Sequence, residues 1–199
     1  PDRDARAFEA VASAVEVMTP RVEIVRPGVL AFPARGPSRY FGGDDAVAAL
    51  ARDHAMKHGG DVGVGIADGM FAALLAARLG STTVVAPRTA ASFLAPYPVA
   101  ALEQARPDRD PGSGCPGNMP ELCDLLRRLG LRTLGDVAAL PPSRLVERFG
   151  PLGTLASRLA RGLEERPPEP REVPLDLVVS TELDPPVDRV ETAAFVART

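Results

Sequence analysis

Three arginines, a threonine and two glycines gather within residues 125–140, and together they could hold a phosphate group. The spacing predicts a helix, a turn bounded by Gly130 and Gly135, and a second helix capped by Asp136. A glycine turn before a helix directs backbone N–H groups at an anion, and arginines add charge beside it, without reading base sequence. The candidate phosphate-binding residues are Arg127, Arg128, Gly130, Arg132, Thr133 and Gly135, with Gly117 in an earlier turn.

The alternative for this segment is an ordinary pair of helices, because short glycine turns join these too. The distribution of charge favours phosphate binding. Residues 121–162 contain seven arginines and four acids, although the whole chain of 199 residues has a net charge of −3. Residues 163–199 contain nine acids and four arginines. A surface that meets a polyanion is therefore expected only over the basic segment.

A second turn is predicted at Pro27-Gly28, where two short apolar strands within residues 22–32 form a β-hairpin. The only acid of this hairpin is Glu23. Phosphoryl transfer with two metal ions needs several carboxylates near the reacting phosphate, and one carboxylate is too few. The hairpin alone fits a plain structural element of an α/β domain equally well.

Two other patterns are weak. Residues 63–69 contain three glycines, but Asp68 stands where the dinucleotide-binding fingerprint needs a glycine. His54 and His58 lie four residues apart on a predicted helix, and two ligands fall short of the four that structural zinc requires. We therefore expect neither a cofactor nor a bound metal.

The remaining residues of chemical interest have ordinary explanations. Cys115 and Cys123 show no disulfide or metal spacing and predict free thiols in a reducing cytoplasm. Tyr40 and Phe41 could form an exposed aromatic patch, but we expect both rings to pack against the edge of a sheet. No apolar run is long enough to span a membrane.

The elements that position these residues follow from the periodicity of the apolar residues, and their order is typical of an α+β fold. The expected elements are a helix at 8–18, the hairpin at 22–34, a loop at 36–43, a helix at 44–57 capped by Asp44 or Asp45, a strand at 62–67, a helix at 69–79 capped by Asp68, a strand at 82–85, a loop at 105–116 and short helices at 119–163. Because the chain starts at Pro1 without methionine, we expect a fragment of a longer protein.

In their order, these segments resemble the Y-family (translesion) DNA polymerases. Residues 22–33 resemble the palm pattern V-E-x-x-S-I-D-E-A-x-L-D, and residues 63–76 resemble the palm pattern S-V-G-I-A-x-N-K-x-L-A-K-x-A. Residues 126–137 match the thumb pattern L-x-x-L-G-I-x-T-x-G-D-L. The family's P-G-I-G hairpin falls on residues 116–119, where Met119 replaces the second glycine.

The resemblance implies a loss of chemistry. The metal-binding Asp-Glu pair of the family falls on Gly28 and Val29, and two palm lysines fall on Met70 and Leu74. Neither glycine nor valine has a side chain that binds a metal, so no catalytic residue is expected. The chain looks most like the ImuB group, catalytically inactive Y-family homologues of bacteria. We therefore expect that it is not an enzyme.

The fold expected from the resemblance is α+β, with a partial Y-family palm followed by an all-helical helix-hairpin-helix thumb. The palm covers residues 1–95 and lacks the family's N-terminal strand and fingers. The thumb covers residues 96–163, a linker follows at 164–174, and residues 175–199 begin a little-finger domain.

The function implied is that of a non-catalytic DNA-binding adaptor in a damage-induced translesion complex, or mutasome, in the cytoplasm at the nucleoid. The implied partners are primer–template DNA, an error-prone replicative-type polymerase, the sliding clamp and a RecA-like accessory protein, with no membrane contact. Two alternatives stay open. One is an active Y-family polymerase with displaced carboxylates, and the other is a small-molecule α/β enzyme with a helical domain.

Overall fold

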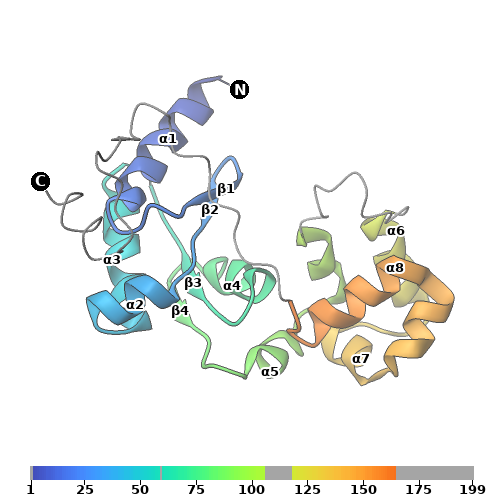
Figure 1. The fold of residues 1–199 in the computed structure, drawn as a ribbon. Coiled ribbons are helices and arrows are strands. Elements are labelled where there is room, and N and C mark those ends of the chain that lie inside the picture. The colour runs from blue at the N-terminus through green and yellow to red at the C-terminus, as the bar shows by residue number, and fades with distance from the viewer. Residues whose placement is uncertain (1, 59, 106–117, 165–199) are drawn as a thin grey trace, which may run out of the picture.

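The structure, a computed structural model, describes residues 2–58, 60–105 and 118–164, with side chains from residue 8 onward. Its elements form two lobes (Figure 1). We call residues 2–86 the mixed lobe, because it holds helices and strands, and residues 90–164 the helical lobe. The expected start of a little-finger domain at 175–199, and the linker beyond residue 164, lie outside the described residues.

The first helix of the mixed lobe packs against the third. Helix α1 (Asp2–Glu16) and helix α3 (Asp44–Met56) are joined by a hydrogen bond between Nδ1 of His54 and the carbonyl oxygen of Ala14, 2.9 Å apart. His54 therefore links two helices, while His58 is exposed. No group of three or more metal-binding side chains occurs among the residues that the structure describes.

The β-hairpin forms where the sequence predicts it. Strands β1 (Glu23–Arg26) and β2 (Val29–Ala31) pair in antiparallel fashion, with Glu23 opposite Ala31. Gly28 at the turn has a φ of +84°, a conformation that glycine adopts without the steric cost that other residues meet. The Pro-Gly turn thus joins two short strands.

The loop expected at 36–43 is wrong, because helix α2 (Arg35–Phe41) occupies most of it. Pro37 lies in the first turn of this helix, where the missing N–H would have no helical partner. Gly42 ends the helix with a φ of +95°. The hydroxyl of Ser38 donates a hydrogen bond to the carboxylate of the first residue of α3, so the two helices meet at a fixed corner.

The next three elements form a β–α–β unit. Strands β3 (Val64–Ile66) and β4 (Thr82–Val84) are parallel, and helix α4 (Met70–Ala77) connects them. Among the described residues this pair is separate from the hairpin, so the strands of the mixed lobe form two small sheets. The strand, helix and strand themselves lie where the periodicity predicts them.

Close packing of helix against strand explains the glycines of this unit. A Cβ added at Gly63 would lie 1.8 Å from the carbonyl oxygen of Ala77, and one at Gly65 would lie 2.1 Å from that of Ala73. Both distances are far below any real contact. The glycines that imitate a dinucleotide loop in the sequence therefore let α4 approach β3, as a glycine in a strand often does.

The N-terminus of α4 is capped by a residue other than Asp68, which the sequence predicts as its cap. Asp68 does not cap the helix, because its carboxylate accepts the backbone N–H of Arg88. The N-cap residue is Gly69, which offers no side chain. Instead the carboxylate of Glu164, from the far end of the described chain, accepts the N–H of Phe71. An acid at a helix N-terminus is electrostatically favourable, and here it also joins the two lobes.

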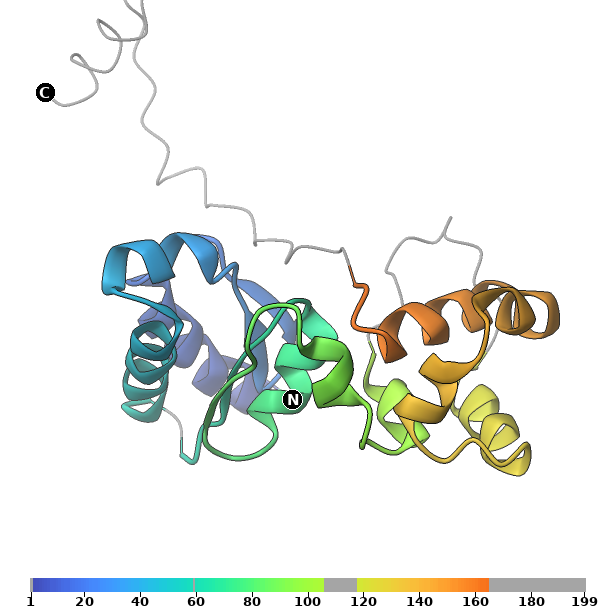
Figure 2. The same cartoon turned by 90° about the horizontal axis from the view of Figure 1, so that it is seen from below.

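The helical lobe follows β4, and each regular element described in it is a helix. These are α5 (Ala90–Leu94), the 3₁₀ helix η1 (Val99–Gln104), α6 (Met119–Arg128), α7 (Leu134–Ala139) and α8 (Pro142–Ala160). Helix α8 bends sharply at Gly150, whose φ is +56°, just before Pro151. Figure 2 shows the two lobes side by side after a quarter turn.

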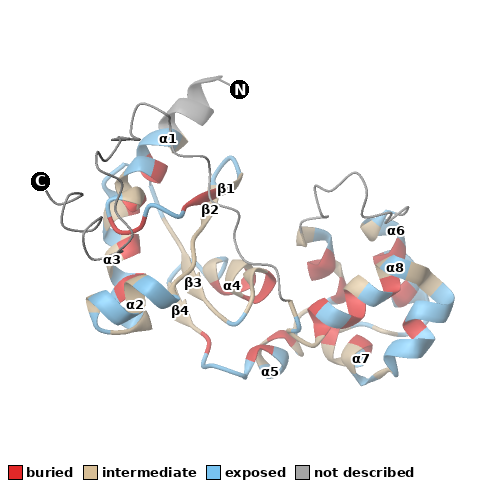
Figure 3. Ribbon diagram, in the orientation of Figure 1, coloured by how far each residue is buried: buried red, intermediate tan, exposed pale blue. Residues whose placement is uncertain are grey.

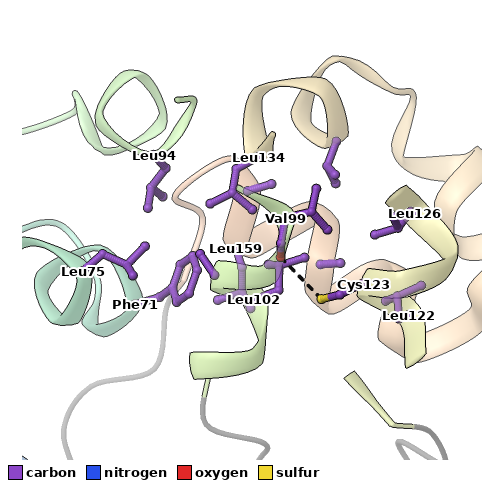
Figure 4. Packing of buried hydrophobic residues seen from close by; sticks show 14 of the residues in the cluster. Phe71, Leu75, Leu94, Val99, Leu102, Leu122, Cys123, Leu126, Leu134 and Leu159 are labelled. Carbon is purple, nitrogen blue, oxygen red and sulfur yellow. Dashed lines mark hydrogen bonds between the residues drawn. The ribbon is translucent and has the colours of Figure 1, made fainter. Parts of the chain in front are cut away.

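A shared apolar core holds the helical lobe to the mixed lobe. Phe71 and Leu75 of α4 belong to the same cluster of buried side chains as Leu94, Leu102 and Leu134 (Figure 4). Figure 3 shows the buried residues gathered on the inner faces of the helices. The lobes are therefore packed against each other through α4, and the covalent chain is not their only connection.

Cys123 lies in this core and is chemically quiet. Its Sγ lies 3.4 Å from the carbonyl oxygen of Val99, to which the thiol donates a hydrogen bond (Figure 4). Burial raises the pKa of the thiol to about 11, so the thiolate that would react is absent near neutral pH. The prediction of a free thiol is confirmed for Cys123, and Cys115 lies outside the described residues.

Candidate nucleic-acid interface

The segment between α6 and α7 is a tight turn around Gly130. This residue has a φ of +87°, and its N–H donates to the carbonyl oxygen of Arg127, 3.0 Å away. The next N–H, that of Leu131, donates to Leu126, also at 3.0 Å. Two helices joined by a glycine turn therefore occur where the sequence predicts them.

A reciprocal pair of hydrogen bonds closes the start of α7. The hydroxyl oxygen of Thr133 accepts the N–H of Asp136 at 3.1 Å. The carboxylate of Asp136 accepts the N–H groups of Thr133 at 2.8 Å and of Arg132 at 2.9 Å. This is a capping box, in which Thr133 is the N-cap and Asp136 is the third helical residue. The expectation that Asp136 is the cap, and that Gly135 bounds the turn, is therefore wrong.

These hydrogen bonds lower the pKa of Asp136 below its usual value of 3.8. The main cause is the N–H of Thr133, followed by the N–H of Arg132, since both stabilise the charged carboxylate. Asp136 is ionised near neutral pH, and its carboxylate faces the N–H groups of Arg132 and Thr133 in the turn.

The first N–H groups of α7 are bound by a distant part of the chain. Leu134 donates to the carbonyl oxygen of Tyr97 at 2.8 Å, and Gly135 donates to that of Ala95 at 3.0 Å. In return Val99 donates to the carbonyl oxygen of Arg132 at 2.9 Å. The segment between α5 and η1 therefore lies along the start of α7, where a free helix N-terminus would otherwise attract an anion.

This arrangement changes how the turn could hold a phosphate. Every backbone N–H from residue 129 to residue 136 has an acceptor within the protein. No such group is left at this turn for a phosphate, contrary to the mechanism expected from the sequence. Gly130, Thr133 and Gly135 thus shape the turn, and only side chains can supply its contacts to an anion.

The arginine side chains around the turn are exposed. Arg127 forms an ion pair with Asp124, one turn earlier on α6. The guanidinium groups of Arg128 and Arg132 have no hydrogen bond or ion pair within the described residues. Free arginines at the two ends of a rigid turn suit the bidentate binding of phosphate oxygens.

Helix α8 adds two arginines that the sequence reading did not single out. Arg144 and Arg148 are exposed, and Arg148 lies over the ring of Phe149, 5.7 Å from its centroid. Two others are used inside the lobe, since Arg158 donates to the carbonyl oxygen of Leu163 and Arg161 to that of Leu140. Part of the positive charge counted along the sequence is therefore structural.

The earlier turn cannot be placed. Gly117 lies outside the described residues. The helix that follows starts at Met119 with Asn118 as its N-cap, and the side-chain amide of Asn118 donates to Glu121 at 3.2 Å. The phosphate contact expected at this turn stays a prediction.

The two hairpin residues that the resemblance sets against the family's Asp-Glu pair carry no carboxylate. Gly28 is exposed at the hairpin tip, and Val29 begins β2 half-buried. Glu23 is 4% exposed and has interactions of its own. Met70 is the first residue of α4, and Leu74 lies half-buried on it. The loss of catalytic residues at Gly28 and Val29 stays a prediction.

Among the described helices, none combines the length and the apolar character that crossing a bilayer requires.

Comparison with known proteins gives polymerase-related matches. No family model matches the chain. It is 33% identical to the DNA polymerase IV of Halobacterium salinarum over 147 residues, which are 70% of this chain and 33% of that protein. It is 31% identical to the protein ImuB of Caulobacter vibrioides over 153 residues, 75% of this chain and 30% of ImuB. The DNA polymerase IV of Methanoculleus marisnigri is 30% identical over 144 residues, 71% of the chain and 34% of that protein.

The chain therefore spans about a third of the length of the curated relatives it matches. These matches support a relationship to the Y-family DNA polymerases. The relatives carry both names, DNA polymerase IV and ImuB, and thus do not single out the ImuB group.

The same matches correct one expectation. The sequence was expected to come from a protein that is not an enzyme, but several relatives are named DNA polymerase IV, which is the name of an enzyme. The match of the family's Asp-Glu pair to Gly28 and Val29 is too narrow a basis for that conclusion, since it concerns one hairpin, and the chain spans about a third of the length of these relatives.

Proposed function

We propose that this chain supplies a DNA-binding lobe to a protein of DNA-damage tolerance, and that its arginine side chains hold the phosphate backbone. The observation that carries the proposal is the pair Arg128 and Arg132, exposed and unpaired within the described residues, on either side of a turn fixed by hydrogen bonds. The relationship to proteins named DNA polymerase IV and ImuB supports DNA as the polyanion.

The mechanism is positioning without base readout. The capping box and the hydrogen bonds to the segment 95–99 fix the backbone of the turn, so the arginines start from defined Cα positions. Guanidinium groups contact phosphates of any sequence and release counterions when they do so. Binding is therefore expected to weaken with salt and to depend little on base sequence.

Under this proposal the two lobes correspond to two domains of the Y-family polymerases. The partial palm expected at residues 1–95 corresponds to the mixed lobe together with α5, and the thumb expected at 96–163 corresponds to the rest of the helical lobe. The helix, hairpin, β–α–β unit and helical hairpin follow one another in the order of the Y-family patterns. Primer–template DNA is the substrate that such a pair of domains would hold. A replicative-type polymerase, the sliding clamp and a RecA-like protein remain the partners predicted from the ImuB resemblance.

Fluorescence anisotropy with labelled primer–template DNA tests the proposal. The double variant Arg128→Gln, Arg132→Gln is compared with Arg21→Gln, Arg78→Gln, which removes two exposed arginines of the mixed lobe. Loss of two phosphate contacts is expected to weaken binding at least tenfold in the first variant, whereas the control stays within about twofold of wild type. Equal affinity of all three proteins would refute the assignment of the interface, and no binding at low salt would refute DNA binding by this chain.

A further inference from the structure

Tyr40 lies at the C-terminal end of α2 with 84% of its surface exposed. The sequence predicted that it packs together with Phe41, and only Phe41 does so. Phe41 is half-buried against the small core formed by Met18, Val47 and Ala51. A large aromatic ring left in solvent beside a packed one needs an explanation, because burial of such a ring is strongly favourable.

The ring of Tyr40 is held in place although it is exposed. It contacts Phe41 at nearly a right angle, 85°, with the ring centroids 4.8 Å apart. One turn earlier on the helix stands Gly36, where even an added Cβ would meet nothing within 4 Å. Because a helical side chain leans over the preceding turn, the absence of a side chain there leaves the ring uncovered. The N–H of Gly43 donates to Ser38 at 2.7 Å and secures the end of the helix.

The helix that carries the ring is basic. Arg35 and Arg39 are exposed and have no ion pair or side-chain hydrogen bond within the described residues. Helix α2 contains no acid. The next acids along the chain, Asp44 and Asp45, belong to α3, and Asp44 accepts the hydrogen bond of Ser38.

We propose that Tyr40, with Arg35 and Arg39, is a stacking platform for a base of single-stranded nucleic acid. An open aromatic ring offers a face to any base, and adjacent arginines offer charge to its phosphates. A protein partner is less well matched, because α2 exposes no second large apolar side chain, and interface cores are contiguous and apolar.

Helix α2, which carries the platform, and helices α6 and α7 lie at opposite ends of the described molecule (Figures 1 and 2). The two contacts would therefore meet different stretches of a nucleic acid, with the turn on a duplex and Tyr40 on an unpaired strand. The platform rests on its own residues and does not require the arginines of the helical lobe.

The tyrosines themselves provide the readout. The chain contains two tyrosines and no tryptophan, so a Tyr97→Phe variant reports on Tyr40 alone. Stacking of a base on the ring is expected to quench its emission as oligo-dT is added, while a duplex of the same length quenches it much less. Emission that stays constant up to millimolar oligo-dT would overturn the proposal.

Substitutions separate stacking from simple exposure. Tyr40→Phe keeps a ring and is expected to bind labelled oligo-dT as wild type does, whereas Tyr40→Ala is expected to bind about tenfold more weakly. Arg39→Gln should weaken binding, and Arg78→Gln, an exposed arginine at the end of α4, should not. Equal affinity of Tyr40→Ala and wild type would refute the platform.

Binding to a blunt duplex, which has no unpaired strand, distinguishes this inference from the proposed function. Tyr40→Ala should leave duplex binding intact, and the double variant of Arg128 and Arg132 should leave quenching by oligo-dT intact. Quenching that persists when duplex binding is absent would reject the helical-lobe interface and keep the platform. Duplex binding with no quenching of Tyr40 by oligo-dT would keep the helical-lobe interface and reject the platform.

Discussion

The hairpin turn at Gly28 and the α6–α7 turn at Gly130 look alike when each is taken alone. Both glycines have a positive φ, +84° and +87°, and an added Cβ would meet nothing within 4 Å of either. Their surroundings differ. The first turn projects into solvent between strands of four and three residues, whereas the second is bound by a capping box and by hydrogen bonds from the segment 95–99.

This difference shows that a glycine turn does not by itself provide free N–H groups. At the α6–α7 turn the groups that could bind an anion are consumed by the protein, and rigidity is what they provide. Under the proposed function, phosphate binding is left to Arg128 and Arg132, whose side chains are exposed beside that rigid turn. The predictions below compare the two turns, starting from the largest expected effect.

Truncation of the core beside each turn should separate them most clearly. Leu134, the first residue of α7, is fully buried, whereas Leu30 of β2 is half-buried. Leu134→Ala is expected to lower the free energy of unfolding by about 2–5 kcal/mol, since it leaves a cavity in the shared core. Leu30→Ala should lower the free energy of unfolding clearly less than Leu134→Ala does. Urea unfolding followed by circular dichroism measures both, and equal losses would mean that the two turns are equally supported.

Alanine at the two glycines should give similar, smaller losses. Neither Gly28 nor Gly130 has a neighbour that a methyl group would strike, so the cost is the positive φ alone, about 1–2 kcal/mol in each case. The same urea titration gives both values. A much larger loss for Gly130→Ala would show that this glycine is needed for more than its backbone conformation.

Removal of the N-cap should affect the second turn only. Thr133→Ala removes the acceptor of the Asp136 N–H and is expected to cost about 1 kcal/mol, whereas Thr133→Ser keeps the oxygen and should stay near wild type. Thermal or urea unfolding of the three proteins checks this. Serine as damaging as alanine would place the role of Thr133 in its methyl group.

The smallest effect expected is the pH dependence due to Asp136. Its pKa is lower in the folded chain than the usual 3.8, so its carboxylate stabilises the fold above that pH. The contribution is lost as the pH falls through the lowered folded value. The difference in urea midpoint between wild type and Asp136→Asn should therefore be constant from about pH 7 to pH 5 and shrink below pH 3.8. A difference that persists unchanged into strong acid would contradict the capping box.

Local signals in the sequence were enough to place most elements. The Pro27-Gly28 hairpin, the helices around Gly130 and the strand–helix–strand unit follow from turn residues and apolar spacing, which act over a few residues. Helix α2 was missed because Gly36, Pro37, Gly42 and Gly43 read as loop residues, although Pro37 falls in the first turn and the last two glycines follow the helix.

Contacts between distant segments left no trace that a single sequence could show. Gly63 and Gly65 resembled a nucleotide loop, and only their distance to the carbonyl groups of α4 reveals a packing role. The hydrogen bonds from Leu134 and Gly135 to the segment 95–99 involve backbone atoms alone, which carry no residue signature. For the same reason the arginines could be chosen as candidates from their residue type, whereas the hydrogen bonds that occupy the N–H groups beside them could not be predicted.

The salt dependence of DNA binding tests the central claim most directly. The dissociation constant of primer–template DNA is measured from low to moderate salt for wild type, for Arg128→Gln, Arg132→Gln, and for Gly130→Ala. If two arginines contact phosphates, the slope of log Kd against log salt should be shallower by about 2 in the double variant and unchanged in Gly130→Ala. An unchanged slope in the double variant, with a loss of binding in a folded Gly130→Ala, would show that the turn backbone and not the arginine side chains holds the phosphate.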